Sequence, residues 1–481
     1  MTLHDWFTSG CTATAILLTT ALFQPLQADE AATNAEIAAA LKAISSRLDA
    51  VENRLERPTE TSATEAALRS EVAELRAQLA ALSQTVEAQT ATLDRVCEVT
   101  YIEGGSKGVP YLPDQKPKEQ RLEFVTSKYR LCLYGYIKLD GSYDTQMVKN
   151  GNLAFFVLPD TGGADDEFNL TANQTRMGLK VDTPARGGDV HGRLEVDFYG
   201  GGGENKPNPR LRLAFAEYKR KNWSLLAGQD WDTLITIFPR SVNFSYFGFQ
   251  GRLGYRRPQL RYTRKSELGE GLFTSKFAIG RTVGGDIDGF GTDDGADAGF
   301  PHLQWNFIYE RPVFNLENTK AKVSVSGHYG QEEVDRSLAS GELNFNTWSV
   351  VGSFFVPFTE KLALQGSVWT GTNLDDFYAG IGQGINGTLG TEIAAWGGWA
   401  QLLYAPAPDW KLSFGGGIDD PDDDDLNIDD RTFNYLGVAN VFWTGLDPLE
   451  LAFEYSYLET GYKGQDDAVS HRLQGAVIFK F

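Results

Sequence analysis

The chain has 481 residues, with 44 Lys and Arg against 64 Asp and Glu, and a formal net charge of −20. Apolar residues make up 42% and aromatics 12%, which excludes a chain that is disordered throughout. A mean hydropathy of −0.30 excludes a membrane protein built from apolar helices of about 20 residues each. The acidic balance disfavours nucleic-acid binding. What remains is a soluble β-rich protein or an outer-membrane barrel, whose alternating strands are polar on average.

Residues 1–28 have the pattern of a secretory signal peptide. Ala13–Phe23 is an apolar stretch of 11 residues, which is long enough for a signal and too short to cross a membrane. His4 and Asp5 stand where Lys or Arg is usual. The residues before Cys11 do not resemble a lipoprotein cleavage site. We therefore expect secretion without a lipid anchor.

Residues 29–97 are predicted to form a periplasmic coiled coil. No aromatic residue occurs between Phe23 and Tyr101, and apolar residues recur with heptad spacing. Pro58 interrupts the pattern, so two helices are expected. The seam requires a partner, either the second helix folded back as a hairpin or other copies of the chain, and we favour other copies. The heptad positions are Ile37, Leu41, Ile44, Leu48, Val51, Leu55, Leu68, Val72, Leu75, Leu79, Leu82, Val86, Gln89, Leu93 and Val96.

Residues 98–128 are expected to be an irregular linker, because Gly and Pro recur through them. Removal of the signal would leave two cysteines, Cys97 and Cys132, on either side of this linker. In an oxidising compartment an even number of cysteines favours a disulfide between them. Two buried, unpaired thiols are the alternative.

Residues 129–481 show the alternation of β-strands. At the chain's end Leu473, Val477 and Phe479 are apolar, whereas Arg472 and Gln474, on the alternate positions, are polar. The segment that begins at residue 130 alternates in the same way. Apolar residues that face lipid and polar residues that face water describe a transmembrane barrel, although a soluble sandwich alternates as well.

The connections between these segments alternate between short and long, which distinguishes the two architectures. Seven short turns and eight long loops join sixteen strands, with both ends of the domain on the short-turn side. The short turns are Thr183–Gly188, Arg220–Asn222, Ser266–Glu270, Arg311–Asn318, Pro357–Glu360, Ala405–Asp409 and Gly445–Pro448. The long loops are 145–170, 200–208, 230–257, 283–300, 331–340, 376–390, 419–430 and 461–467. We therefore predict an all-β transmembrane barrel of about 16 antiparallel strands.

Several segments resemble strands of sixteen-stranded porins. They are Leu131–Asp144, Thr175–Val181, Gly192–Phe198, Leu225–Trp231 and Arg256–Thr263. The C-terminal Phe481, preceded by alternating apolar residues, resembles the signal read by the barrel assembly machinery. Together with the coiled coil, these features resemble the DcaP-type porin family, with phosphate-type porins as near relatives. The resemblance implies an outer-membrane homotrimer that takes up small anions, including dicarboxylates.

Acidic residues concentrate in two long loops. One holds Asp286, Asp288, Asp293, Asp294 and Asp297, and the other holds Asp419, Asp420, Asp422, Asp423, Asp424, Asp425, Asp429 and Asp430. Such runs are usually solvated surface. The alternative is a divalent cation at Asp422, Asp423, Asp424 and Asp425, because hard cations prefer clustered carboxylates. At the outer rim such a site could bridge neighbouring lipopolysaccharide.

The basic residues occupy other positions, and nine arginines are the predicted anion path. Arg176, Arg193, Arg210, Arg212 and Arg261 alternate with apolar residues and are expected to point inward, and Arg240, Arg252, Arg256 and Arg257 belong to loop 230–257. In porins the third long loop folds into the lumen. Guanidinium groups there would favour anions. The alternative is that these arginines pair with Glu195, Asp197 or Glu217 and brace the wall; Asp230 and Asp232 also oppose the anion hypothesis.

An enzyme is disfavoured, because none of the five His lies in a Ser/His/Asp pattern and no nucleotide-binding glycine motif is present. We expect no catalytic residues and no cofactor. The predicted function is an outer-membrane porin of a Gram-negative bacterium for small hydrophilic solutes, with a preference for small anions. The alternative is an outer-membrane anchor whose periplasmic coiled coil tethers the membrane to the cell wall.

Overall fold

The computed structural model describes residues 128–481, apart from short gaps at 161–162, 164, 204–205, 286–292, 315, 317–318 and 336–341. Before residue 128 it describes 122–125 and isolated helical positions between 46 and 80. The predicted signal peptide, coiled-coil seam and most of the linker lie outside the described residues. Those segments therefore stay predictions.

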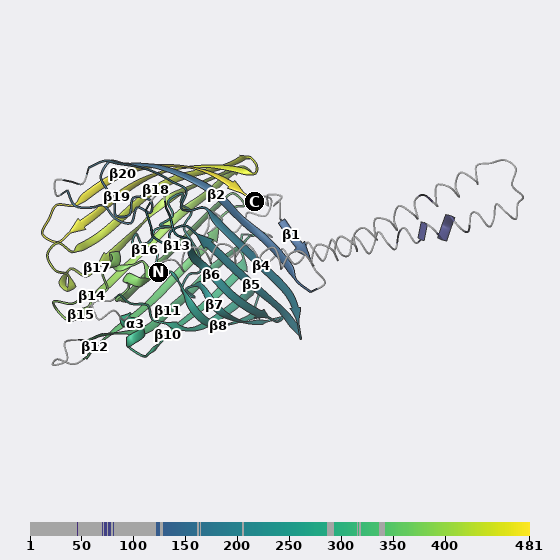
Figure 1. Cartoon of the computed structure of the whole chain (residues 1–481), viewed down its shortest axis with the longest axis horizontal. Coiled ribbons are helices and arrows are strands. Elements are labelled where there is room, and N and C mark those ends of the chain that lie inside the picture. The colour runs from purple at the N-terminus through teal and green to yellow at the C-terminus, as the bar shows by residue number, and fades with distance from the viewer. Residues whose placement is uncertain are drawn as a thin grey trace, which may run out of the picture. The chain divides into compact units, whose positions relative to one another are not determined.

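The described residues form a closed antiparallel β-barrel (Figure 1). Its strands are β2 (Arg130–Asp144), β3 (Glu167–Thr171), β4 (Arg176–Ala185), β5 (Gly188–Asp197), β6 (Arg210–Lys219), β7 (Trp223–Trp231), β8 (Arg256–Leu268), β9 (Gly271–Arg281), β10 (Pro301–Pro312), β11 (Lys320–Asp335), β12 (Glu342–Pro357), β13 (Leu362–Thr372), β16 (Ala394–Ala407), β17 (Trp410–Pro421), β18 (Arg431–Leu446), β19 (Leu449–Tyr462) and β20 (Ala468–Lys480). A further short strand, β1 (Leu122–Val125), lies within the predicted linker.

The barrel counts as sixteen-stranded, because β3 and β4 pair in succession with the two halves of β2 and act as one interrupted strand. Closure comes from β20, whose register with β2 runs from Tyr136 opposite Lys480 to Asp144 opposite Arg472. Phe481 completes the seam, since its backbone exchanges two hydrogen bonds of 3.1 Å with Gly135. The predicted number of strands is confirmed.

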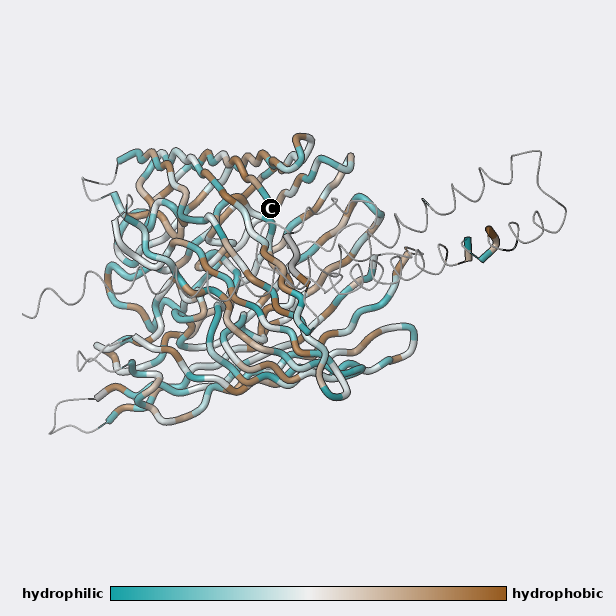
Figure 2. The backbone as a smooth tube through the Cα atoms, turned by 45° about the vertical axis from the view of Figure 1, so that its right-hand side comes forward, coloured by the Kyte–Doolittle hydropathy of each residue, from teal (hydrophilic) through white to brown (hydrophobic). Residues whose placement is uncertain are grey.

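The side chains of the barrel are arranged with apolar groups outside and polar groups inside. On β2, Ile137 is 55% exposed whereas the adjacent Lys138 is 3% exposed. On β20, Val477 is 45% exposed and Arg472 only 1%. Figure 2 shows the same alternation along the strands. Because the exposed face is the apolar one, it suits lipid, and the polar face lines the lumen.

The short turns and long loops lie at opposite ends of the strands, as predicted. In the described part of the chain the long loops carry α3 (Asp294–Asp297), the 3-10 helices η1 (Asp375–Phe377), η2 (Gly380–Gly382) and η3 (Asp423–Asp425), and the hairpin β14 (Ile385–Asn386) and β15 (Thr391–Glu392). No helix among the described residues has the length and apolar character needed to cross a membrane.

Apolar clusters form inside the barrel, where loops pack against inward-facing side chains. In one cluster Phe247, from the loop between β7 and β8, contacts Trp399 of β16 with ring centroids 6.1 Å apart. In another, Leu234 of the same loop packs with Trp369 of β13 and Phe377 of η1. The interior of the barrel is thus built around this loop.

Candidate functional site

The loop between β7 and β8, residues 232–255, folds into the lumen and is called here the constriction loop. Each of its residues is buried apart from Phe249 and Tyr255, which are half-buried. The sequence-based expectation that the third long loop enters the lumen is therefore confirmed by the position of these residues.

Polar side chains of the barrel wall hold the constriction loop through its backbone. Lys138 of β2 donates to the Val242 carbonyl over 2.9 Å. Glu454 of β19 accepts hydrogen bonds from the Val242 amide at 2.8 Å and the Asn243 amide at 3.2 Å. Further donors to loop carbonyls are Asn306, Ser326, Gln365, Trp369, Gln401 and Asn440. These contacts tie the loop to the wall from β10 to β19 and to β2.

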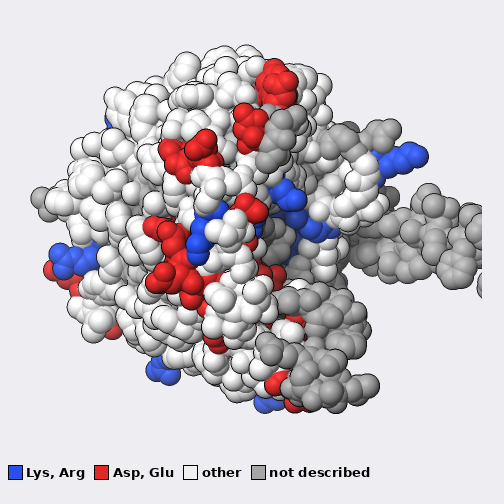
Figure 3. Space-filling model, turned by 90° about the vertical axis from the view of Figure 1, so that its left-hand side faces the viewer, with Lys and Arg blue, Asp and Glu red and all other residues white. Residues whose placement is uncertain are grey.

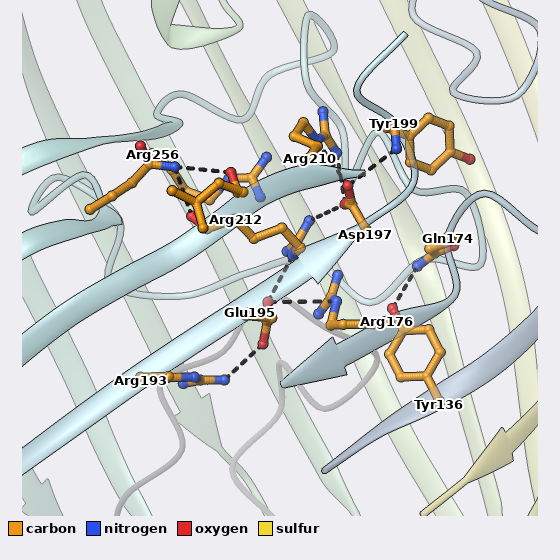
Figure 4. A network of polar contacts seen from close by, with 12 residues as sticks. Tyr136, Gln174, Arg176, Arg193, Glu195, Asp197, Tyr199, Arg210, Arg212 and Arg256 are labelled. Atoms are coloured by element: carbon orange, nitrogen blue, oxygen red, sulfur yellow. Dashed lines mark hydrogen bonds and ion pairs between the residues drawn. The ribbon is translucent and has the colours of Figure 1, made fainter. Parts of the chain in front are cut away.

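The wall formed by β4, β5, β6 and β8 faces the constriction loop with an arginine cluster (Figure 4). We define this cluster as Arg176, Arg193, Arg210, Arg212 and Arg256 together with Glu195 and Asp197. Alternation brings every second residue of each strand to the lumen, and the register places Asp197 of β5 opposite Arg210 of β6. The five guanidinium groups therefore converge from four strands.

The two carboxylates pair with four of the five arginines. Arg212 Nε donates to Glu195 Oε1 over 2.7 Å, and Arg193 lies 3.0 Å from the other oxygen of Glu195. Arg176 lies 3.6 Å from Glu195. Asp197 receives Arg210 and Arg212, each at 2.8 Å. Five positive and two negative side chains leave a formal charge of +3.

Arg256 differs from the other arginines of the cluster because it is stacked on aromatic rings. Its guanidinium carbon lies 5.0 Å from the centre of the Trp231 ring and 4.5 Å from that of Tyr255. Nη2 donates to the Tyr255 hydroxyl, whereas Nε and Nη1 have no hydrogen-bond acceptor among the described residues. The side chain is 7% exposed. These two N–H groups are available to an anion or to water.

The structure separates the other four predicted arginines from this cluster and gives each a bracing contact. Arg257 pairs with Asp232 at 2.6 Å, and Arg261 pairs with Asp230 at 2.7 Å. Arg252 donates to the carbonyls of Ser245, Tyr246 and Gly254 within its own loop. Arg240 donates to the Leu412 carbonyl of β17 at 3.1 Å.

The alternative hypothesis for the arginines is therefore correct for part of the set. Glu195 and Asp197 do brace the wall, whereas Glu217 pairs with Lys219 at 3.2 Å. Sequence reasoning missed the aromatic side chains that face the cluster. Phe244 lies 5.2 Å from the Arg212 guanidinium carbon and stacks on Tyr199 at 5.1 Å. The aromatic residues of the third long loop were the available signal.

The long-loop end of the barrel carries the acidic residues. Figure 3 shows this end, with Asp and Glu side chains spread over it and a few Lys and Arg side chains between them. Within the run of aspartates, Asp422 caps η3 and Asp425 accepts from the Ala394 amide at 2.9 Å. In the described part of the chain no group of three or more His, Cys, Asp or Glu side chains is placed to hold a metal ion. The proposed cation site thus gains no support and stays a prediction.

Of the two cysteines in the predicted disulfide, the structure describes one. Cys132 is buried on β2, and its Sγ lies 3.8 Å from the Leu133 carbonyl oxygen. Cys97 lies outside the described residues, so the disulfide stays a prediction.

Phe481 closes the β2–β20 seam, which fits its predicted importance for assembly without testing it.

Comparison with known proteins gives consistent matches. A sequence model of the DcaP outer membrane protein family matches residues 105–321. The fold is similar to the outer membrane channel DcaP of Acinetobacter baumannii, at 18% identity and a TM-score of 0.58, over 74% of this chain and 99% of that chain. It is also similar to an anion-selective porin from Comamonas acidovorans, at 13% identity and a TM-score of 0.49, over 74% of this chain and 100% of that chain. No curated protein sequence matches the chain.

These matches confirm the resemblance to the DcaP family that the sequence motifs indicated. The similarity to the Acinetobacter structure shows a porin fold. The family match and the barrel support an outer-membrane location and a protein that is not an enzyme.

Proposed function

We propose that this DcaP-like outer-membrane barrel is a porin through which small hydrophilic solutes diffuse passively, with a preference for small anions such as dicarboxylates. The observation that carries the proposal is the arginine cluster, which has five guanidinium groups against two carboxylates beside the constriction loop. A guanidinium group remains charged at every physiological pH and binds a carboxylate through two parallel N–H groups.

The location of the cluster explains how an acidic protein would conduct anions. The constriction loop is bonded to the wall from β10 to β19 and to β2, so a solute that passes between this loop and the strands β4, β5, β6 and β8 would pass the cluster. Arg193 and Arg210 are half-buried and therefore reachable from the lumen. Fixed positive charge in a narrow passage lowers the barrier for an anion more than charge at an open rim, where water and salt screen it.

The same proposal includes the assembly that the DcaP resemblance implies. Three barrels would associate in the outer membrane, with outer-membrane lipid and lipopolysaccharide around them. The predicted coiled coil would lie in the periplasm, on the side of the short turns. Insertion would depend on recognition of the C-terminal strand by the barrel assembly machinery.

The test is to reconstitute the purified mature protein in a planar bilayer and to measure the zero-current potential in a KCl gradient. Current steps in groups of three with a potential of the anion-selective sign are the expected result. Stepwise conductance with cation selectivity would retain the porin and reject the role of the arginines. A barrel that inserts and stays silent would reject the porin and favour the membrane-anchor alternative.

A further inference from the structure

A second loop packs on the constriction loop at the long-loop end of the barrel. Residues 373–393, called here the latch loop, connect β13 with β16. The Phe249 amide donates to the Tyr378 carbonyl and the Gly254 amide donates to the Phe377 carbonyl, each over 2.7 Å. The rings of Tyr255 and Tyr378 have centroids 4.5 Å apart. The positions of the two loops are therefore coupled.

The coupled residues have a backbone conformation that requires support from their surroundings. Phe249 has a φ of 61° and Tyr378 a φ of 57°, and bulky residues seldom adopt the left-handed region. Such conformations persist only where the surrounding structure stabilises them. Loss of the contacts on one loop is therefore expected to loosen the residues of the other loop that face it.

Carboxyl groups collect beside this junction. Asp375 and Asp376 of η1 immediately precede Phe377. When ionised, their carboxylates repel that of Glu332 of β11, which is 3% exposed. Around them lie Asp293 and Asp294 near α3, Arg257 of β8, and His302 and His328, whose rings contact Phe377. The basic groups nearby have other partners, because Arg257 pairs with Asp232 and Arg281 pairs with Asp293.

One oxygen of Asp375 and one of Asp376 lack a hydrogen-bond donor among the described residues. Gly384 faces Asn373 Oδ1 and Asp375 Oδ1 so closely that no Cβ would fit there, so the Asn373 and Asp375 side chains are neighbours. Neither oxygen receives a hydrogen bond from the described residues, and neither does Asp376 Oδ2. A buried carboxylate oxygen without a donor is unfavourable, whereas a protonated carboxyl group supplies an O–H donor and carries no negative charge.

We propose that Asp375, Asp376 and Glu332 form a proton-controlled latch, which holds the latch loop on the constriction loop when protonated and releases it when ionised. Repulsion among the ionised carboxylates would push η1 away from β11 and weaken the hydrogen bonds of Phe377 and Tyr378 to the constriction loop. The latch regulates the pore proposed above.

The pKa values of Asp375 and Asp376 determine whether the docked state gains or loses stability as the pH rises. Burial raises the pKa of Asp375, and burial with the charge of Asp375 raises the pKa of Asp376 to about 7. In the released loop the pKa would be near the ordinary value of about 4. The docked state therefore binds protons more tightly. Its stabilisation is complete below pH about 4 and is lost as the pH rises through about 7.

The experiment follows both amide exchange and conductance of the full mature protein between pH 5 and pH 8. After correction for intrinsic exchange rates, we expect peptides from 373–393 and 232–255 to exchange at least tenfold faster at pH 8. Conductance should rise over the same interval, because the released latch loop no longer covers the constriction loop at the long-loop end of the barrel. Addition of Ca²⁺ or EDTA should change neither measurement.

The variant D375N/D376N carries neutral side chains of the same shape and should remain docked, with slow exchange and low conductance at both pH values. The matched control is D466N, an exposed acid in the loop between β19 and β20, which should behave as the unchanged protein does. Exchange that is independent of pH in the unchanged protein would overturn the latch, as would the same pH response in D375N/D376N or a response to Ca²⁺. Amide exchange can be measured without any current through the barrel. A pH-dependent exchange in a barrel that does not conduct would therefore reject the porin function and retain the latch.

Discussion

Arg256 Nη2 donates a hydrogen bond of 2.7 Å to the hydroxyl of Tyr255, and Arg210 Nη1 donates to the same oxygen over 3.1 Å. Two cationic side chains from β8 and β6 thus share one acceptor on the constriction loop. Burial acts to raise the pKa of Tyr255, but the charges of Arg256 and Arg210 outweigh it, so the pKa is lowered. The phenol links the positive wall to the loop that narrows the lumen.

Replacement of Arg256 by glutamine should weaken anion selectivity. Arg256 has no carboxylate partner among the described residues, so its charge contributes directly to the net positive charge of the cluster. A unit charge about 4 Å from a passing anion contributes about 1 kcal/mol in a water-like medium. We therefore expect the anion-to-cation permeability ratio to fall about fivefold, measured from the zero-current potential.

Arg186→Gln is the matched control for this charge change, because Arg186 is exposed in the turn between β4 and β5. It should leave the permeability ratio unchanged. Equal effects of the two substitutions would mean that overall charge governs selectivity, and the specific role of the cluster would be rejected.

Glu195→Gln should destabilise the barrel more than it changes conduction. Glu195 is 3% exposed and accepts ion-pair contacts from Arg176, Arg193 and Arg212. Its neutralisation leaves three guanidinium groups together without their main counterion. Removal of one partner from a buried ion pair costs about 3–5 kcal/mol. The fraction of protein that stays folded in detergent on heating, seen as a gel-mobility shift, should fall well below that of R186Q; unchanged heat resistance would contradict the bracing role.

The strands could be predicted from the sequence because each carries its own signal. Alternation along β2 and β20 depends only on neighbouring residues, and the turns between strands are marked by local Gly, Pro and Asn. The interruption between β3 and β4 was not predicted, since it depends on pairing with two halves of another strand. The predicted number of sixteen strands is nevertheless correct, because both pieces pair with β2 and count as one strand.

The site could be predicted only in part, for a related reason. Period-two alternation correctly placed Arg193, Arg210 and Arg212 in the lumen. The partners of Arg252 and Arg257 depend on how the constriction loop folds, and its conformation is set by contacts with strands up to about two hundred residues away, such as the bonds from β19. No local pattern encodes such contacts. The latch loop was missed because its docking partner is another loop.

Glu454→Ala should widen the pore. Its carboxylate accepts hydrogen bonds from Ser241, Val242, Asn243 and Asn440, so it holds the middle of the constriction loop to β18 and β19. Loss of these bonds should raise single-channel conductance and the size of the largest permeant sugar in a liposome-swelling assay. Glu459→Gln, on the outer face of the same strand, is the control. Unchanged conductance in E454A would show that the loop needs no such tether.

The orientation of the barrel in the membrane can be tested with arginine at two depths on β20. Leu473 and Val469 both face outward, with 47% and 37% exposure; Leu473 lies near the middle of the strand, and Val469 lies one residue from its loop end. Arginine on the lipid face costs about 2–4 kcal/mol at the middle of the bilayer and about 0–1 kcal/mol near its edge. L473R should therefore reduce the yield of folded protein in liposomes strongly, whereas V469R should change it little. If both variants insert equally well, the outward face does not contact lipid, and the membrane assignment of the barrel would have to be abandoned.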